Sequence, residues 1–184
     1  NESCTCNKGY TLVDGECVSC PAGTYKASTG PGACTLCPAG TYSSMLHATQ
    51  EADCTPCQDD SNSPAGSTVA SNCTCNEGRA GANCELCAAG TYCSGGLVFN
   101  CTLYSNSPVG SMTGEACTCD PGYTLTGYQG NCTACPLNTY KDYSGNDTCS
   151  ECPIPLVTAR NASDSLGRCV APLATLDLLV GLAK

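Results

Sequence analysis

Cysteines recur through this chain at short and similar intervals, and their spacing restricts the fold more than any other feature. The hexapeptide Cys-Pro-Ala-Gly-Thr-Tyr begins at Cys20, and identical or similar hexapeptides begin at Cys37, Cys87 and Cys135. Each copy places a tyrosine five positions after its cysteine, and short Cys-X-X-Cys pairs join successive loops. No catalytic residue type recurs with the copies, so the chain is organised as repeats of a structural unit.

The chain has too little apolar material for a conventional hydrophobic core. It contains 21 Cys in 184 residues, no Trp and one Phe, and only 18 Leu, Ile, Val and Phe residues precede Cys169. A chain of this composition would not stay folded through apolar burial alone. Disulfides would supply the missing stability, at about 3 kcal/mol for a loop of about fifteen residues, and they persist in extracellular compartments.

The order of the cysteines suggests a simple pairing, although sequence alone does not fix connectivity. If Cys4 is set aside, neighbouring cysteines pair without remainder, and each Cys-X-X-Cys joins two loops instead of closing on itself. The expected disulfides are Cys6–Cys17, Cys20–Cys34, Cys37–Cys54, Cys57–Cys73, Cys75–Cys84, Cys87–Cys93, Cys101–Cys117, Cys119–Cys132, Cys135–Cys149 and Cys152–Cys169.

Three segment types alternate: Cys-Thr-Cys triplets with a short loop, Gly-Thr-Tyr units, and a polar Ser-Asn-Ser-Pro loop at Ser61 and Ser105. Gly and Pro interrupt every stretch that could become a helix. The pattern predicts a small disulfide-rich fold, an elongated ladder of short β-hairpin and loop modules with almost no helix except in the C-terminal tail. The expected segments are a partial repeat with a Cys-Thr-Cys loop over 1–19, two Gly-Thr-Tyr units plus the long polar loop over 20–72, a second repeat over 73–116, a third over 117–169, and an apolar tail over 170–184.

Asparagine glycosylation is expected because half of the twelve Asn residues lie in Asn-X-Ser/Thr sequons. Covalent glycans are expected, and no cofactor. The predicted acceptors are Asn1, Asn72, Asn100, Asn131, Asn146 and Asn161.

The charge and hydropathy of the chain restrict its partners. A net charge of −9 argues against nucleic acid and against anionic membrane surfaces. No apolar run reaches membrane-spanning length, so no span is expected in this segment. The remaining expectation is self-association into a polymer, or membership of a longer parent chain.

Two regions depart from the repeat. Cys4 takes the place of Cys73 and Cys117 in their triplets but has no upstream partner; the natural chain begins earlier, Cys4 bonds to another subunit, or its thiol is free. The tail suits either a helix or a strand, and would pack on the last repeat, dock on a neighbouring subunit or following domain, or begin a membrane anchor. The candidate intersubunit residues are Cys4, Leu173, Leu176, Leu179 and Val180.

Zinc and redox chemistry are the rival interpretations of the cysteines. The two pairs between Cys17 and Cys37 have the spacing of a zinc ribbon. However, sequons adjoin cysteines at Asn72, Asn100 and Asn131, which favours an oxidising compartment and disulfides. A catalytic Cys-X-X-Cys would need a basic neighbour or a helix terminus, and the six pairs lie in loops.

The acidic residues and the single histidine give no catalytic constellation. Asp59 and Asp60 read as solvated turn residues, and His47 as a surface residue. A calcium site near Glu51 and Asp53, or near residues 142–147, lacks the spacing of a calcium loop. We therefore expect no catalytic residue, no metal site and no enzyme activity.

The tyrosines of the hexapeptides, Tyr25, Tyr42, Tyr92 and Tyr140, have two interpretations. Each ring would pack over the adjacent disulfide as the small apolar contact of its unit. Alternatively, the four rings would form a row that faces a carbohydrate or protein ligand.

The repeats resemble known extracellular families. Cys-Pro-Ala-Gly-Thr-Tyr followed by Gly and Cys-X-X-Cys is similar to the cysteine-rich repeats of ephrin receptors and tumour necrosis factor receptors, most clearly over 20–57, 87–119 and 135–169. The Asn-Ser-Pro-Ala-Gly-Ser loop followed by Cys-Thr-Cys resembles tandem arrays in large extracellular proteins of algae and protists, including mastigoneme-like proteins. The resemblance implies extended arrays of one-disulfide and two-disulfide modules.

The function expected from these features is structural. The chain would be a secreted or cell-surface glycoprotein, or a segment of one, that forms a rod-like subunit of a filament, flagellar hair or coat. The alternative is the ectodomain of a receptor or adhesin that uses the repeats as a spacer or ligand platform.

Overall fold

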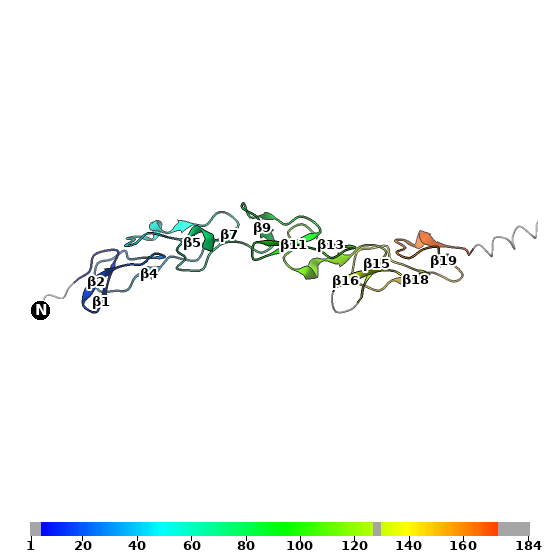
Figure 1. Ribbon diagram of the computed structural model, residues 1–184, viewed down its shortest axis with the longest axis horizontal. Helices are drawn as coiled ribbons and strands as arrows, with labels where there is room; N and C mark the ends of the chain where they lie inside the picture. The colour runs from blue at the N-terminus through cyan, green and yellow to red at the C-terminus, as the bar shows by residue number, and fades with distance from the viewer. Residues whose placement is uncertain (1–4, 127–129, 173–184) are drawn as a thin grey trace, which may run out of the picture. The chain divides into compact units, whose positions relative to one another are not determined.

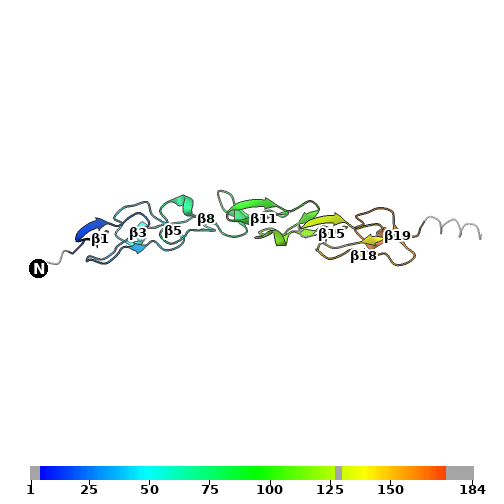
Figure 2. The same ribbon diagram turned by 60° about the horizontal axis from the view of Figure 1, so that its bottom comes forward.

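The computed structural model describes residues 5–126 and 130–172. These residues fall into two compact units, one comprising the chain up to Leu86 with Ser94–Leu97, the other Cys87–Cys93 with the chain from Val98 onward. Each unit is a succession of short, two-stranded antiparallel hairpins (Figure 1, Figure 2).

The hairpins of the first unit have strands of two to four residues, because cysteines and turn residues bound every strand. The pairs are β1 (Tyr10–Val13) with β2 (Glu16–Ser19), β3 (Thr24–Tyr25) with β4 (Thr35–Leu36), β5 (Thr41–Tyr42) with β6 (Thr55–Pro56), β7 (Ser61–Asn62) with β8 (Thr74–Cys75), and β9 (Arg79–Ala80) with β10 (Glu85–Leu86).

The second unit also consists of two-stranded hairpins. The turn of its first hairpin, Ser94–Leu97, is assigned to the first unit. The pairs of the second unit are β11 (Thr91–Ser94) with β12 (Leu97–Asn100), β13 (Ser105–Asn106) with β14 (Thr118–Cys119), β15 (Tyr123–Thr126) with β16 (Asn131–Ala134), β17 (Thr139–Tyr140) with β18 (Ser150–Glu151), and β19 (Val157–Thr158) with β20 (Cys169–Val170).

Helical structure in the described residues is limited to four single 3-10 turns, each ending just before the second cysteine of a disulfide. They are η1 (Glu51–Asp53), η2 (Ala70–Asn72), η3 (Gly114–Ala116) and η4 (Leu166–Arg168). The prediction of a small disulfide-rich fold of short hairpins with almost no helix is therefore confirmed for residues 5–126 and 130–172.

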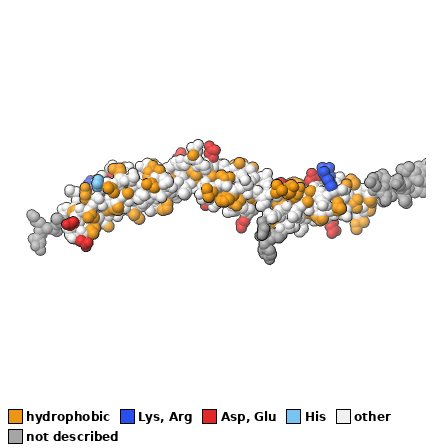
Figure 3. All heavy atoms as spheres, viewed as in Figure 1, with side chains coloured by type: hydrophobic (Ala, Val, Ile, Leu, Met, Phe, Trp, Pro, Cys, Tyr) orange, Lys and Arg blue, Asp and Glu red, His pale blue; other side chains and the backbone are white. Residues whose placement is uncertain are grey.

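Cysteines account for nearly all of the buried hydrophobic residues of the hairpins. Apart from Ala48 and Ala80, every buried hydrophobic residue is a disulfide-bonded cysteine. Large apolar side chains lie at the surface instead, as Leu97 and Ile154 do at 64% and 97% exposure, and Figure 3 shows hydrophobic side chains scattered over the visible face. This distribution agrees with the composition, which offered no conventional core.

We call the first cysteine of each disulfide its opening cysteine. In nine of the ten disulfide loops, the residue three positions after the opening cysteine has a left-handed backbone conformation. At Gly23 and Gly122 a β-carbon would meet the carbonyl oxygens of Gly66 and Ala162, each two hairpins further along the chain, so only glycine fits. The nine residues are Gly9, Gly23, Gly40, Asp60, Gly78, Gly90, Tyr104, Gly122 and Asn138, with φ between 60° and 83°.

Candidate functional site: the junctions between hairpins

Backbone hydrogen bonds join each hairpin to the one that follows it within its unit. The Gly23 N–H donates to the Ser43 carbonyl at 2.7 Å, and the Gly23 carbonyl accepts from the Cys37 N–H at 2.8 Å. Gly90 makes the same two contacts in the second unit, to Ser107 and from Cys101, at 3.0 and 2.9 Å. The left-handed residue therefore turns the chain and also carries the bonds that join neighbouring hairpins.

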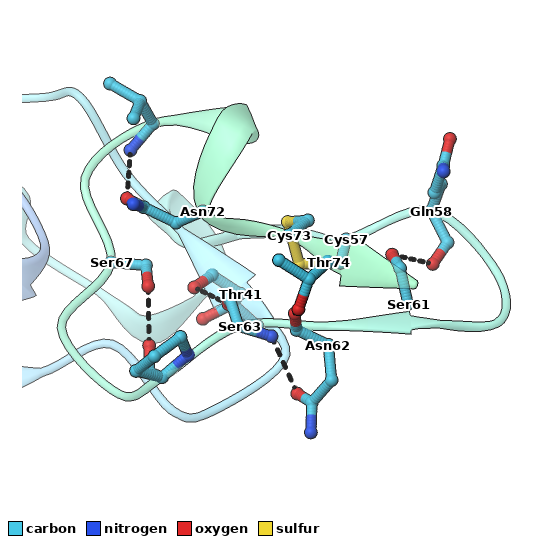
Figure 4. Close-up of a disulfide and its surroundings, with 12 residues drawn as sticks. Thr41, Cys57, Gln58, Ser61, Asn62, Ser63, Ser67, Asn72, Cys73 and Thr74 are labelled. Atoms are coloured by element: carbon cyan, nitrogen blue, oxygen red, sulfur yellow. Dashed lines mark hydrogen bonds between the residues drawn. A yellow bond between two sulfur atoms is a disulfide. The ribbon is translucent and has the colours of Figure 1, made fainter. Parts of the chain in front are cut away.

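Nine of the ten hairpins are also closed by one disulfide; in the tenth, the Cys87–Cys93 bond closes a loop that ends within β11, before the turn to β12. The disulfides of the structure are Cys6–Cys17, Cys20–Cys34, Cys37–Cys54, Cys57–Cys73, Cys75–Cys84, Cys87–Cys93, Cys101–Cys117, Cys119–Cys132, Cys135–Cys149 and Cys152–Cys169. Their Cα atoms are 5.2–6.1 Å apart, within the usual range for disulfides. Figure 4 shows the Cys57–Cys73 bond and its surroundings.

One buried side chain reaches back across each of four junctions. It lies six positions after the opening cysteine and donates to the residue four positions after the preceding opening cysteine. The contacts are Lys26 Nζ to the Tyr10 carbonyl at 2.7 Å, Ser63 Oγ to Thr41 at 2.9 Å, Ser107 Oγ to Thr91 at 2.8 Å and Lys141 Nζ to Tyr123 at 2.9 Å. We call these four side chains the junction residues; Figure 4 shows Ser63 beside Thr41.

The two junction lysines are unusual because they are almost completely buried. Lys26 is 4% exposed and Lys141 is 1% exposed. Each ammonium also donates to a second carbonyl, in the loop of its own hairpin: Lys26 to Gly30 at 2.6 Å, and Lys141 to Gly145. The lysine therefore links three segments of main chain, and its hydrogen bonds compensate for its burial.

The electrostatics of Lys141 follow from this burial. Removal from water lowers the pKa of its amine, and the negative charge of Asp147 acts in the opposite direction. The Nζ atom also lies 5.4 Å from the centre of the Tyr143 ring, within range of a cation–π contact.

At the serine junctions, no side chain of the described residues bonds to a second carbonyl as the lysines do. The loop is held instead by hydrogen bonds among its own residues. Asn62 Oδ1 accepts from the Ser63 N–H at 2.9 Å, and Ser67 Oγ donates to the Pro64 carbonyl at 2.7 Å. Ser107 and its loop repeat these contacts at 2.8 and 2.7 Å. These bonds explain why Ser-Asn-Ser-Pro-X-Gly-Ser occurs twice in the sequence.

The predicted glycan acceptors within the described residues are all exposed: Asn72, Asn100, Asn131, Asn146 and Asn161. Two have oriented amides. Asn72 Oδ1 accepts from the Thr68 and Val69 N–H groups at 3.2 and 3.3 Å, and Asn146 Oδ1 accepts from the Cys119 N–H at 3.2 Å. These contacts leave the amide nitrogen, the atom that would carry a sugar, outside the bonds. Glycan attachment at these positions stays a prediction.

The repeated tyrosines Tyr25, Tyr42, Tyr92 and Tyr140 are partly buried, and each is followed in sequence by a buried residue. The Tyr25 hydroxyl donates to Glu51 at 3.3 Å, and the Tyr92 ring stacks on Phe99 with centroids 5.2 Å apart. Packing of the four rings over the disulfides stays a prediction.

Asp53, Asp60 and His47, which were considered as candidate site residues, have structural partners. Asp53 Oδ2 accepts from the Thr49 and Gln50 N–H groups, at 2.7 and 3.2 Å, and these bonds lower the pKa of its carboxyl. Asp60 pairs with Arg79 at 2.9 Å, and the His47 ring stacks on Tyr10.

Metal sites and membrane spans are absent from the part of the chain that the structure describes. Over residues 5–126 and 130–172, no three His, Cys, Asp or Glu side chains are grouped so as to hold a metal ion. Within the same ranges, no helix has the length and apolar character needed to cross a bilayer. The predicted acceptor Asn1 and the proposed joint residues Cys4, Leu173, Leu176, Leu179 and Val180 lie outside the described residues.

The buried junction residues were not singled out in the sequence analysis. A signal was present. Gly-Tyr-Thr-Leu begins at Gly9 and at Gly122, and each copy is followed by a Thr-Tyr-Lys whose lysine is Lys26 or Lys141. The four-residue spacing from lysine to glycine, which sets the second carbonyl contact, is also the same in both copies.

Comparison with known proteins gives the same two regions. Residues 9–54 and 122–169, just over half of the chain, match the family described as "Tyrosine-protein kinase ephrin type A/B receptor-like". Both junction lysines lie inside these segments. The expected likeness to ephrin-receptor repeats is thus confirmed, whereas the likeness to tumour necrosis factor receptors and to mastigoneme-like proteins stays a prediction.

Curated relatives share a shorter stretch. Over 88 residues, the chain is 36% identical to "Sushi, von Willebrand factor type A, EGF and pentraxin domain-containing protein 1" of Rattus norvegicus and 38% identical to the Mus musculus protein. Each match covers 45% of this chain and 2% of the relative, so the chain spans only a small part of those proteins. With half of its length matched and disulfides closing its hairpins, the chain belongs to the ephrin type A/B receptor-like family of extracellular cysteine-rich repeats.

Proposed function

We propose that this chain is a glycosylated structural protein of the extracellular space, or a segment of one, and acts as a rod-like subunit of a filament, flagellar hair or coat. The observation that carries the proposal is the junction: a hairpin closed by its own disulfide is bonded through main chain and a buried side chain to the next hairpin. Repeats joined only to their neighbours add length without adding a central core. Cys4 and the tail after Cys169 are the proposed joints between subunits.

Electron microscopy of native material would test the polymer. The expected result is a regular fibre or coat whose repeat distance matches the length of the isolated subunit. A second preparation that ends at Pro172 and carries Cys4→Ser should remain as single particles if the proposed joints are correct. Polymers that form equally well without both joints would assign assembly to another surface.

A second function is favoured by the match to a small part of a long multidomain relative. In that case the repeats act as a spacer or ligand platform in the ectodomain of a receptor or adhesin. Native material would then appear as single molecules on a cell surface. Solution scattering of the purified chain separates both proposals from a compact domain, because a rod gives a linear cross-section region that a sphere of the same mass does not.

A further inference from the structure

A groove in the second unit has two predicted glycan acceptors, Asn100 and Asn146, in its wall. It has a volume of about 400 Å³ and is lined by residues that include Tyr92, Asn100, Thr102, Gly114, Glu115 and Asn146. This volume is at the lower end of the roughly 300–1,000 Å³ range of small-molecule sites, which is room for a sugar ring. Because Asn100 is itself part of the wall, a sugar attached there would begin inside the groove.

The tyrosine in this groove is held as a fixed flat surface. Phe99 stacks on Tyr92 with an interplanar angle of 15°, and Gly114 lies so close that a β-carbon there would be 3.3 Å from the ring. The aliphatic face of a sugar packs well on a fixed aromatic ring, and carboxylate and amide groups bind its hydroxyls. Glu115 provides a carboxylate in the same wall.

The first unit contains an equivalent groove without the acceptor. Its lining includes Tyr42, Pro56, Gln58 and Ala70, and its volume is about 250 Å³. Pro56 precedes Cys57 as Asn100 precedes Cys101, so proline occupies the place of the acceptor asparagine. The larger groove and the attachment point thus occur together.

We infer that the Tyr92 groove is the seat of the first N-acetylglucosamine of the protein's own glycan, attached through Asn100. The inference rests on the proposed glycosylation and adds a defined contact for one of the glycans. An externally supplied saccharide would meet a groove that is already filled. Seating would also reduce access to the bond between Asn100 and the sugar.

Site-resolved deglycosylation tests this inference. The 184-residue chain, secreted from a eukaryotic host, is treated under native conditions with a peptide N-glycosidase, and release at each asparagine is followed by mass spectrometry. Release at Asn100 is expected to be at least about tenfold slower than at Asn161, a factor that corresponds to about 1.4 kcal/mol. Reduction and denaturation should remove the difference, and Tyr92→Leu, which keeps an apolar contact with Phe99, should largely remove it.

A transplanted acceptor provides the matched control. The double substitution Pro56→Asn with Gln58→Thr creates a sequon at the same place in the smaller groove, where no ring equivalent to Phe99 supports the tyrosine among the described contacts. Its glycan should be released as fast as that of Asn161. Equally slow release there would assign the protection to the hairpin itself and overturn the inference.

Two further outcomes would also overturn it. If mass spectrometry finds Asn100 unmodified, both the seat and glycosylation at that position are wrong, whereas the rod proposal is decided separately by microscopy and scattering. If Asn100 carries a glycan that is released as fast as that of Asn161, glycosylation stands and the seat is wrong.

Discussion

The lysine junctions and the serine junctions perform the same task with different chemistry. At Lys26 and Lys141 one long cation bonds to the preceding hairpin and to a loop of its own hairpin. At Ser63 and Ser107 a hydroxyl makes only the first bond, and the loop is closed by its own Asn, Ser and Pro residues. The two kinds of junction therefore share the same backbone hydrogen bonds. The sequence of the loop determines whether a lysine or a serine occupies the junction position.

The largest effect is expected from converting a lysine junction into a serine junction. Lys141→Ser leaves the Gly145 carbonyl and part of the former lysine volume without a partner, because its loop lacks the Asn-Ser-Pro contacts. A loss of about 3 kcal/mol is expected from one or two unpaired buried carbonyls. Hydrogen exchange at the Gly122 and Gly145 amides should accelerate by about 10²-fold.

The exposed Lys8 supplies the control for this substitution. Lys8→Ser should leave exchange at the same amides unchanged. If Lys141→Ser accelerates exchange no more than Lys8→Ser does, the buried ammonium is not what holds the lysine junction together.

A smaller loss is expected at a serine junction. Ser63→Ala removes a single hydrogen bond and leaves the Thr41 carbonyl unpaired, which should cost about 1 kcal/mol. The measurement is exchange at the Gly40 amide, which donates to the Ser63 carbonyl. Ser61→Ala, which removes an exposed bond to the Gln58 carbonyl, should have a weaker effect. Equal effects of the two substitutions would mean that the Ser63 bond across the junction contributes no more to stability than an exposed bond does.

A modest gain is expected in the hairpin that follows the Lys141 hairpin, where an alanine occupies a position that is glycine in the serine hairpins. Ala162 has φ 57°, whereas the corresponding Gly66 and Gly110 have φ 80° and 76°. Ala162→Gly should stabilise the unit by about 0.5–1 kcal/mol, since alanine is strained in this region. Exchange at the Lys141 amide, which donates to Ser163, reports the change; faster exchange would contradict the argument.

The smallest effect is expected from acid. Bonds from Thr49 and Gln50 lower the pKa of Asp53 below 3.8, so its contribution is complete above that pH and is lost as the pH falls through the lowered pKa. Asn72 performs the same capping without a charge. Asp53→Asn should therefore remove the acid sensitivity of exchange at the Cys54 amide, and persistence of that sensitivity would point to another carboxyl.

The sequence was sufficient to predict the hairpins and the scarcity of helix, because turn residues and cysteines fix both locally. The neighbour pairing of Cys20 with Cys34 follows from order alone, and a peptide map of non-reduced protein would test it. The burial of Lys26 and Lys141 could not be read from hydropathy, since it depends on carbonyls that the preceding hairpin brings within reach. The left-handed Tyr104 was equally hidden, because its side chain gives no hint of a position that glycine fills in other hairpins.

The neighbour pairing of disulfides also determines how the chain would respond to a pulling force. Each disulfide closes a loop whose ends are 6 to 17 residues apart, and only two-residue or one-residue links separate most successive loops. Tension applied at the two ends would pass through the sulfur atoms and the short links and bypass the loops. The loops thus hold a reserve of contour length that stays locked while the bonds are oxidised and is released only by reduction.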